Sequence, residues 1–520
     1  MRTPLRRSGG ASLVTVLAGA AVIVAVGSCS PTFQPKSCAQ DGDCGTAKAC
    51  VSEAAGTYCK DVKDAPIRVG MSAPISGTSA ELGIEMRAGV DLAFAEQTKK
   101  GGVNGRAVKL DFRDDGYEPP NAEAAAKELT DAQPAVAGVT HCPETTLKSQ
   151  DANPTPVSTT GLARGPNAVL ALLGNVGTPT MVRAAPVAVE TGTLYFGAFT
   201  GAAAILRDGR AGVSCSKYVF NVRASYAQEA RAALEYFIKL GVKNARHVIS
   251  FDQNDGFGDA GYTGLTKAYA DLSSEGGNGL APLGDGESIA RFRYKRNDTQ
   301  SVLPAAQQAI AQLTSLLAGN TDNHVVGILM TDTYTPAATF IREIRNWQYG
   351  ADPDNTKKAD RLTIIFNNVS FVGPNALAKK LRDDTAAGSP RKPYSDNVFV
   401  SQVVPNYDSD QGEVSRQYRN LVKDAGLEPS FTSFEGYIAG RIFVAGLLNN
   451  KGLFTPDAMV TALETMPDLA LGLGGAARFT AQSHNYLKSI WVTAINADAR
   501  FTNRYYWSDK GTTAISIEEF

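Results

Sequence analysis

Histidine and short catalytic motifs are scarce in this chain of 520 residues. Its four histidines, His141, His247, His324 and His484, are scattered, and no HExxH pair occurs. No GxSxG segment occurs either, so the sequence lacks the marks of zinc peptidases and of α/β-hydrolases. His247 opens an expected strand, where a structural role is favoured.

The sequence also lacks a charge bias. Lysine and arginine total 51 and aspartate and glutamate total 52, which gives a net charge of −1 at pH 7. Proteins that bind nucleic acid or anionic membrane surfaces electrostatically carry clustered basic residues. Neither kind of partner is expected here.

Long apolar runs are absent except near the N-terminus. Residues 13–26 are apolar and follow three arginines within the first seven residues, but the run is too short for a typical membrane span. Residues 1–29 are therefore expected to be a signal peptide. Its last four residues, V-G-S-C, resemble the bacterial lipobox, in which cleavage leaves Cys29 to be acylated; an ordinary signal peptide with an incidental cysteine is the alternative. Acylation of Cys29 would anchor the protein to a membrane, with the rest of the chain on the periplasmic side.

Cysteine is sparse, and four of the seven lie in one segment, residues 30–65: Cys38, Cys44, Cys50 and Cys59. In an oxidising compartment such a cluster predicts two disulfides that staple a linker too small for a core. A zinc site is the alternative, although the intervals of five, five and eight residues differ from the usual closely spaced pairs. Four cysteines allow three pairings, so the connectivity stays open. Cys142 and Cys215 either pair or remain buried thiols.

About 490 residues follow the signal peptide, too many for one core and enough for two domains. Strands and helices alternate from residue 67, and a second alternation begins after residue 218. This pattern predicts an α/β fold with parallel sheets covered by helices on both faces. Strands are expected at 67–71, 108–113, 169–173, 193–196, 246–251, 325–330 and 362–367. Helices are expected at 85–97, 122–129, 225–240, 260–272, 302–317 and 337–347. The stretches 137–166 and 276–297 are expected to be an insertion and a glycine-rich loop.

Residues 169–207 carry the clearest candidate site. Two expected strands end here in loops of glycines and hydroxyls, GNVGTPT at 174–180 and GAFTG at 197–201. Ligands of open α/β sheets lie beyond the carboxyl ends of the strands. Glycine lets a ligand approach backbone N–H groups, and a helix N-terminus favours an anion. Two ordinary strand-to-helix turns are the alternative interpretation.

Several segments, in order along the chain, resemble type I solute-binding proteins of the branched-chain amino-acid transporter family. They begin with IRVGMSAPISGT at 67–78 and GGVNG at 101–105, and continue with FNVRASY at 220–226, TYTP at 333–336, NVSF at 368–371, SQVVP at 401–405 and EGY at 435–437. The resemblance implies two Rossmann-like lobes joined by three crossovers, with a ligand cleft between them. One lobe would comprise residues 66–221 plus 402–486, and the other residues 222–401 plus 487–511.

The resemblance also assigns ligand contacts. Thr178 falls at the hydroxyl position that grips a carboxylate, and Thr200 and Gly201 fall near the positions that hold the ligand's backbone-like groups. Phe257 and Tyr334 fall at aromatic positions of the second lobe. A carboxylate leaving water needs several charge-assisted donors, and an aromatic side chain can cover the ligand. Local packing is the alternative role for each residue.

Two departures from the family pattern bear on the ligand. Amino-acid binders of the family place an acid after the strand near residue 367 to meet the ligand ammonium, whereas this chain has Asn368, Val369 and Ser370, with Ser370 kept as a candidate contact. An aromatic position of the first loop holds Leu82. Both departures weaken the case for an α-amino acid and leave the carboxylate grip in place.

Two further motifs leave room for an enzyme. GFGDAG at 256–261 matches GxGxxG between a strand and a helix, but the bulky Phe257 and the anionic Asp259 favour a plain turn into a helix. Asp114 and Asp115 offer a carboxylate pair, although a solvated turn is favoured.

The sequence therefore predicts a lipid-anchored periplasmic binding protein, not an enzyme, with no cofactor and no metal. It is expected to deliver a small polar, carboxylate-bearing solute, amino-acid-like or amide-like, to an ABC permease in the inner membrane. A sensor that reports to a membrane receptor is the main alternative, and a periplasmic hydrolase a remote one.

Overall fold

The computed structural model describes residues 36–53, 56–135, 161–202, 216–318, 322–350, 355–473 and 477–509. Cys29, Cys142 and Cys215 lie outside these ranges, as do the signal peptide and most of the stretch 137–166. None of the helices in the described ranges combines the length and the apolar character needed to cross a membrane.

The first sheet has five parallel strands in the order β4-β3-β7-β8-β9. Its strands are β3 (Ile67–Ala73), β4 (Val108–Asp114), β7 (Ala171–Leu173), β8 (Leu194–Phe196) and β9 (Val219–Phe220). The connecting helices are α1 (Ala80–Lys99), α2 (Pro119–Leu129) and α3 (Thr178–Glu190). A small ladder of β5 (Gln133–Pro134) and β6 (Leu162–Ala163) lies between α2 and β7 in the chain.

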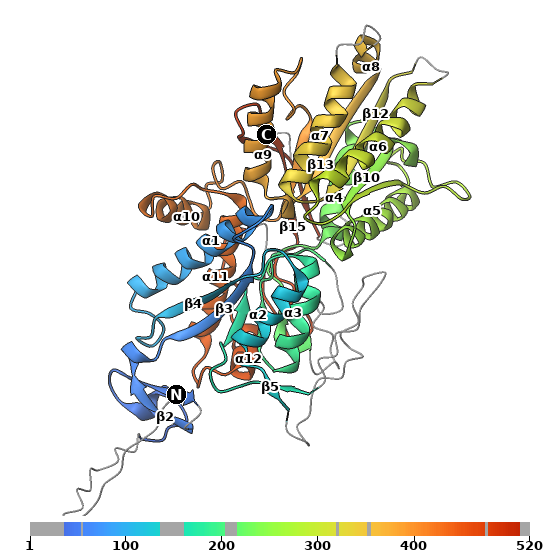
Figure 1. The fold of residues 1–520 in the computed structure, drawn as a ribbon. Coiled ribbons are helices and arrows are strands. Elements are labelled where there is room, and N and C mark those ends of the chain that lie inside the picture. Colours follow the sequence, from blue (N-terminus) through green and yellow to red (C-terminus); the bar gives the residue numbers. More distant parts are fainter. Residues whose placement is uncertain are drawn as a thin grey trace, which may run out of the picture.

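Three later helices complete this first lobe: α10 (Glu413–Asp424), α11 (Phe431–Asn449) and α12 (Pro456–Thr465). α11 runs along α1 at very short range, because a Cβ on Gly89 would lie 1.9 Å from the carbonyl oxygen of Ser433 and one on Gly440 would lie 2.7 Å from Cβ of Ala93. α11 is buried on nearly all sides, as an apolar helix without a polar face should be. Figure 1 shows it behind α1.

The second sheet has seven strands in the order β11-β10-β12-β13-β14-β15-β16, parallel up to β14 and antiparallel beyond. Its strands are β10 (Val248–Gln253), β11 (Ala290–Tyr294), β12 (His324–Thr331), β13 (Leu362–Val369), β14 (Val398–Gln402), β15 (Ser489–Ile495) and β16 (Phe501–Ser508). The helices of this second lobe are α4 (Tyr226–Lys239), α5 (Gly256–Glu275), α6 (Val302–Leu317), α7 (Tyr334–Tyr349), α8 (Asn355–Arg361) and α9 (Pro374–Gly388).

The chain passes between the lobes three times: after β9, after β14 and before β15. Figure 1 shows the lobes end to end with these segments between them. The predicted α/β fold of two parallel-sheet lobes is therefore confirmed.

One expected loop is wrong in part. The stretch 276–297 contains β11, which pairs in parallel with β10 at the edge of the second sheet. Its sequence, ARFRY, alternates arginine with aromatic residues, the period of a strand. Arg291 and Arg293 pair with Asp252 and Asp259 of the neighbouring elements. The strand was missed because this short alternating segment follows a glycine-rich stretch and contains charged residues.

A small disulfide module precedes the first lobe. The structure pairs Cys38 with Cys50 and Cys44 with Cys59, so that the segment before the hairpin of β1 (Lys48–Glu53) and β2 (Gly56–Asp61) is joined to each of its strands. Three of the sulfur atoms lie within 4.8 Å of one another, but each belongs to a disulfide, which leaves no thiolate for the zinc alternative.

The module is docked on the first lobe. Arg106 Nε donates to the carbonyl oxygen of Ala65 at 2.6 Å, and Asn104 donates to Asp41 at 3.1 Å. Leu453, after α11, packs on the cysteine cluster. The segment 36–65 is therefore a packed extension of the lobe, not an extended linker.

Candidate functional site

The loops after β7 and β8 meet at the carboxyl edge of the first sheet, as their sequence predicts. The backbone N–H of Gly177 donates to Phe199 at 3.1 Å, and that of Phe199 donates to Asn175 at 2.8 Å. Gly177 has φ +102° and caps α3, and a Cβ there would lie 2.3 Å from the Tyr117 ring. Only glycine combines this backbone angle with such a close ring.

Thr178 and Thr200 come together at this edge. Their Oγ1 atoms are 2.7 Å apart, and both side chains are buried. Thr200 Oγ1 also accepts from the N–H of Ala202 at 3.2 Å and donates to the Tyr226 hydroxyl at 3.4 Å. Gly201 lies beneath the Tyr226 ring, where a Cβ would come within 2.4 Å of a ring carbon. Two hydroxyls at the N-terminus of α3 thus form a site suited to an anionic oxygen.

Phe257 approaches these hydroxyls from the second lobe. It lies in the first turn of α5, where its N–H donates to the side chain of Asp255 at 3.0 Å. Its ring centroid is 5.3 Å from that of Tyr226 and 4.7 Å from that of Phe371. The structure therefore brings Thr178, Thr200, Gly201 and Phe257 into one cluster.

The cluster includes aromatic residues that the sequence analysis did not select: Tyr117, Phe199, Tyr226 and Phe371, all buried. Phe371 is central, since its ring centroid is 5.1 Å from that of Phe199 and 6.0 Å from that of Tyr117. Phe199 and Phe371 each follow the end of a parallel strand, and that position was the available signal.

Tyr117 is held by a buried acid, which corrects the expectation of a solvated turn at Asp114 and Asp115. Asp114 is exposed, but Asp115 is fully buried and accepts from Ser72 Oγ at 2.7 Å and from the N–H of Tyr117 at 2.9 Å. Burial raises the pKa of Asp115 to about 6. Tyr117 has φ +62°, a strained angle for a bulky side chain, so Asp115 fixes the loop that presents this ring to the cleft.

Tyr334 lies apart from the threonine pair. Tyr334 is half-buried. It lies near Leu82, since both side chains approach Gly373: a Cβ on Gly373 would be 2.7 Å from Leu82 and 3.2 Å from Tyr334. It lines a separate cavity of about 850 Å³ with Glu81 and Glu85. Leu82 is itself buried against this part of the second lobe.

Ser370 belongs to an ion cluster where the lobes join. Its N–H donates to Glu229 at 2.6 Å, and its hydroxyl accepts from Arg223. Arg223 lies 3.6 Å from Glu229 and 3.4 Å from Glu435, and all three side chains are buried. Burial raises the pKa of Glu229 to about 7, against the opposing effect of Arg223.

This ion cluster ties together four parts of the chain: the first crossover, α4, the turn after β13, and α11. The sequence analysis quoted Arg223 and Glu435 within family-like segments without giving either a role. No local signal joins Arg223 to Ser370 or to Glu435, since both are far from it in sequence.

The GxGxxG segment forms the first turns of α5, as predicted from its bulky and anionic side chains. A Cβ on Gly258 would lie 2.0 Å from the carbonyl oxygen of Gln253, and one on Gly261 would lie 2.0 Å from Thr331 Oγ1. Asp259 pairs with Arg291 at 2.6 Å and Arg293 at 2.8 Å. These glycines serve to pack the helix on the sheet.

The described histidines have structural partners. His247 Nε2 lies 3.0 Å from His324 Nδ1, at the amino ends of β10 and β12. His484 is buried between Glu464, at 2.9 Å, and the carbonyl oxygen of Val219, at 2.8 Å. The His247–His324 pair lies away from the carboxyl edges, whereas His484 stacks on Phe220 at the end of β9, where its carbonyl oxygen accepts from the N–H of Asn221.

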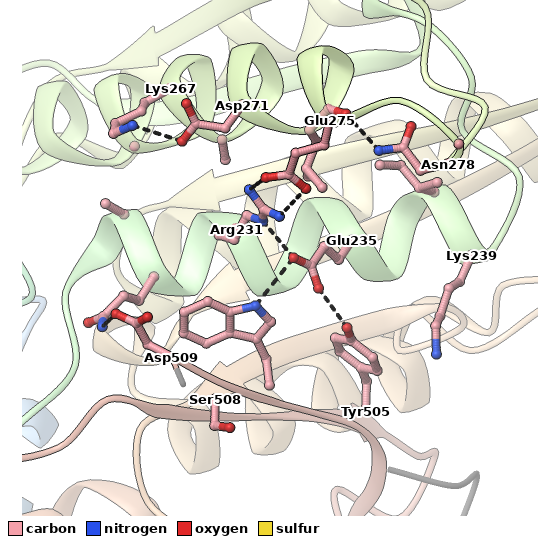
Figure 2. A pocket seen from close by; sticks show the side chains of 18 of the residues that line it. Arg231, Glu235, Lys239, Lys267, Asp271, Glu275, Asn278, Tyr505, Ser508 and Asp509 are labelled. Atoms are coloured by element: carbon pink, nitrogen blue, oxygen red, sulfur yellow. Dashed lines mark hydrogen bonds and ion pairs between the residues drawn. The ribbon is translucent and has the colours of Figure 1, made fainter. Parts of the chain in front are cut away.

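A groove of about 1110 Å³ lies on the second lobe between α4, α5 and β16. Figure 2 shows that Arg231, Glu235 and Glu275 point toward one another: Arg231 bonds Glu275 at 2.7 Å and Glu235 at 2.5 Å, and Glu235 also accepts from Tyr505 at 2.7 Å. The charged residues of this groove are largely paired with one another, and the groove shares no residue with the threonine cluster.

Known proteins share this sequence pattern and this fold. The periplasmic binding protein family matches residues 66–152 and 165–353, more than half of the chain. A solved structure described as a "possible leucine/isoleucine/valine-binding protein" from Rhodopirellula baltica is 30% identical, with a TM-score of 0.62, over 85% of this chain and 97% of that one.

Two other relatives extend the comparison. Leu/Ile/Val-binding protein homolog 2 of Brucella abortus is 37% identical over 65 residues, which are 12% of this chain and 18% of the relative. The match thus spans under a fifth of that protein. A solute-binding protein of an ABC transporter from R. palustris, solved with benzoate, shares the fold, with 18% identity and a TM-score of 0.58 over 87% of this chain and 98% of that one.

Proposed function

Because the chain belongs to the periplasmic binding protein family, we propose that it captures a small carboxylate-bearing solute between its two lobes and delivers it to an ABC permease. It is an extracytoplasmic solute-binding protein related to the branched-chain amino-acid binders, and its relatives are binding proteins, not enzymes. The solute, the permease and the membrane anchor are the proposed parts.

The observation that carries the proposal is the pair of buried hydroxyls at the start of α3. Thr178 and Thr200 lie within 2.7 Å of each other beside the N-terminal backbone of a helix, where an anionic oxygen is stabilised. Each charge-assisted hydrogen bond to a carboxylate is worth roughly 1.5–3 kcal/mol.

The aromatic cluster supports an apolar body for the same solute. Tyr117 and Phe199 come from the first lobe, and Tyr226, Phe257 and Phe371 come from the second, so both lobes contribute rings. Closing the lobes on a ligand would enclose it between these rings and exclude water. The relative solved with benzoate is of interest here, since benzoate is a carboxylate on an apolar ring.

The remaining details rest on the sequence. We infer lobes of residues 66–221 plus 402–486 and 222–401 plus 487–511, and an acyl anchor on Cys29. Replacing Cys29 by serine should then move the protein from membranes to the soluble periplasmic fraction. A sensor that reports to a membrane receptor has the same binding chemistry and differs only in its partner.

The proposal is tested by extracting whatever solute co-purifies with the protein and identifying it by mass spectrometry. Calorimetry then compares this solute with its methyl ester on the full chain. The carboxylate should bind at least tenfold more tightly than the ester, because the ester removes the charge that the hydroxyls and the helix receive. Equal affinity would contradict the carboxylate grip.

A further inference from the structure

A cavity of about 880 Å³, called the module cavity below, lies between the disulfide module and the first lobe. Its lining includes Ile67, the first residue of β3, and Leu170, which directly precedes β7. Since parallel strands begin here, the module cavity lies at the amino edge of the first sheet, whereas the threonine pair lies at the carboxyl edge. Figure 1 shows the module, marked by β2, at the end of the first lobe that is remote from the second lobe. The module cavity is therefore separate from the solute cleft.

Cations outnumber acids in the lining of the module cavity. The described lining residues that carry charge are Lys60, Arg68, Arg106 and Arg164, with Asp64 as the one acid among them. Arg68 is already paired, because it bonds Asp111 at 2.6 Å and donates to the carbonyl oxygen of Asn167 at 2.7 Å. The arginines come from separate segments of the chain, so no basic run in the sequence marks this site.

Arg106 is a buried cation. It is only 7% exposed, its Nε donates to the carbonyl oxygen of Ala65 at 2.6 Å, and its guanidinium lies 5.2 Å from the centre of the Phe454 ring. Burial lowers the pKa of Arg106, and the charge of Asp41 opposes this effect only in part. The bonded partner of Arg106 among the described residues is thus a neutral carbonyl group, and its positive charge is incompletely balanced.

The charge of Arg164 is balanced even less. Its guanidinium donates to the carbonyl oxygens of Val169 at 2.6 Å and Ala168 at 3.3 Å, whereas its Nε is buried and has no hydrogen-bond partner in the described part of the chain. Burial lowers the pKa of Arg164. Burying a charge is costly unless it is paired, so two such guanidiniums on one cavity point to a bound anion.

The hydrogen bonds of the two arginines place both near the start of β3. Arg106 bonds Ala65, which lies two residues before β3. Arg164 bonds Val169, and the N–H of the next residue, Leu170, donates to the carbonyl oxygen of Arg68 in β3 at 2.8 Å. The neighbours of β3 in the sheet are β4 and β7, and Arg106 precedes the first while Arg164 precedes the second. The arginines therefore approach the module cavity from the two sides of β3.

The remaining lining favours a phosphate group as the anion. Thr455 and Pro456, the N-cap and first residue of α12, line the cavity, and a helix N-terminus stabilises an anion. A phosphate group offers more oxygen atoms than a carboxylate, so it can accept from two guanidinium forks at once. Leu453 and Phe454 add apolar surface, and the volume is that of a site for an organic molecule. A phosphate ester therefore suits the cavity as well as inorganic phosphate.

We propose that the module cavity binds a phosphate group between Arg106 and Arg164, either of a soluble phosphate or of a phospholipid headgroup. The inference is independent of the solute in the cleft. A lipid source would agree with the anchor proposed at Cys29. Cys29 precedes Lys36, the first described residue of the module, by seven residues, which span at most about 25 Å.

The experiment uses the full chain with Cys29→Ser, so that an acyl group does not itself hold the protein on membranes. Inorganic phosphate is titrated by calorimetry, with sodium chloride of equal ionic strength as the blank. In parallel, the protein is sedimented with phosphatidylcholine vesicles that contain or lack phosphatidylglycerol. These two probes distinguish a soluble phosphate from a lipid headgroup.

Two variants change the module cavity. Arg164→Gln removes one charge, and Arg106→Lys keeps the charge but loses the planar fork. Arg113→Gln is the matched control, because it removes an exposed guanidinium of the same lobe that pairs with Glu128 at 2.6 Å. Circular dichroism shows whether each variant is folded, and Arg106→Lys decides the test if Arg164→Gln is not.

We expect at least one probe to bind, with a loss of about tenfold or more in both cavity variants and of less than about twofold in Arg113→Gln. Binding of inorganic phosphate would support a soluble source, and binding to phosphatidylglycerol vesicles alone would support a lipid. Binding of neither probe would overturn the inference. Binding that persists in both cavity variants, as for phosphate held in the solute cleft, or an equal loss in Arg113→Gln, would also overturn it.

Discussion

An aspartate is buried at the carboxyl edge of each sheet, Asp115 in the first and Asp332 in the second. The two differ in their hydrogen bonding. Asp115, after β4, accepts hydrogen bonds from Ser72 and from the backbone of Tyr117. Asp332, after β12, has no partner among the described residues. Asp115 has local donors and holds a loop, whereas a buried acid without such donors is an exception among buried polar groups.

The joint between these edges should be the most sensitive point of the molecule. Replacing Arg223 by methionine would leave Glu229 and Glu435 buried without their cation, and breaking a buried pair in this way costs about 3–5 kcal/mol. Urea unfolding measures the loss.

Arg345→Met is the matched control for that substitution. Arg345 is equally buried, but its partners among the described residues are the side-chain amide of Gln348 and the backbone carbonyl oxygens of Ile364 and Asp396, with no bonded carboxylate. Its loss should be smaller, about 1–3 kcal/mol. Equal losses in both variants would show that Arg223 acts by packing rather than by charge.

The pH dependence of stability separates the two aspartates. The pKa of Asp115 is raised by burial to about 6, so its contribution is complete below about pH 4 and is lost as the pH rises through 6. Asp115→Asn should remove this fall, which is about 3 kcal/mol for a shift of about two units.

Urea unfolding between pH 4 and pH 7 checks this prediction. Asp332→Asn, run in parallel, should remove a fall that extends to higher pH, because burial raises the pKa of Asp332 further. Parallel profiles for the parent and Asp115→Asn would contradict the assignment.

The exposed contacts of Glu118 with the second lobe should matter least. Glu118 of the first lobe bonds Arg296 at 3.2 Å and Asn297 at 2.7 Å, but its side chain is 43% exposed. Such pairs contribute about 0–1 kcal/mol and are screened by salt.

Glu118→Gln should therefore weaken solute binding less than fivefold by calorimetry, with the difference vanishing in high salt. Glu128→Gln, which breaks the exposed pair with Arg113 within the first lobe, should have no effect on binding. A tenfold loss for Glu118→Gln in high salt would mean that Glu118 contacts the solute.

Much of the cleft could be predicted from local pattern. Two apolar strands followed by glycines and hydroxyls must end side by side in a parallel sheet, which places Thr178 next to Thr200. Phe257 was expected from the resemblance to the solute-binding family and not from local pattern, and the structure places its ring against Tyr226 and Phe371.

The rest depends on contacts between distant parts of the chain. The sequence around Asp115 predicts a solvated turn. Its burial depends on Ser72, which is 43 residues away and donates to it. Arg223 meets Ser370 across 147 residues, and no spacing rule joins them. The unpaired state of Asp332 can be recognised only when the neighbouring strands are in place.

The most direct test of the account is the affinity of Thr178→Val for the co-purifying solute, measured by calorimetry. Thr191→Val is the matched control, because its buried hydroxyl lies at the other end of α3 and bonds the carbonyl oxygens of Val187 and Ala188 and the hydroxyl of Thr193. The account predicts a loss of about ten- to a hundredfold for Thr178→Val and no change for Thr191→Val. Unchanged affinity in Thr178→Val would contradict the claim that these hydroxyls hold the solute.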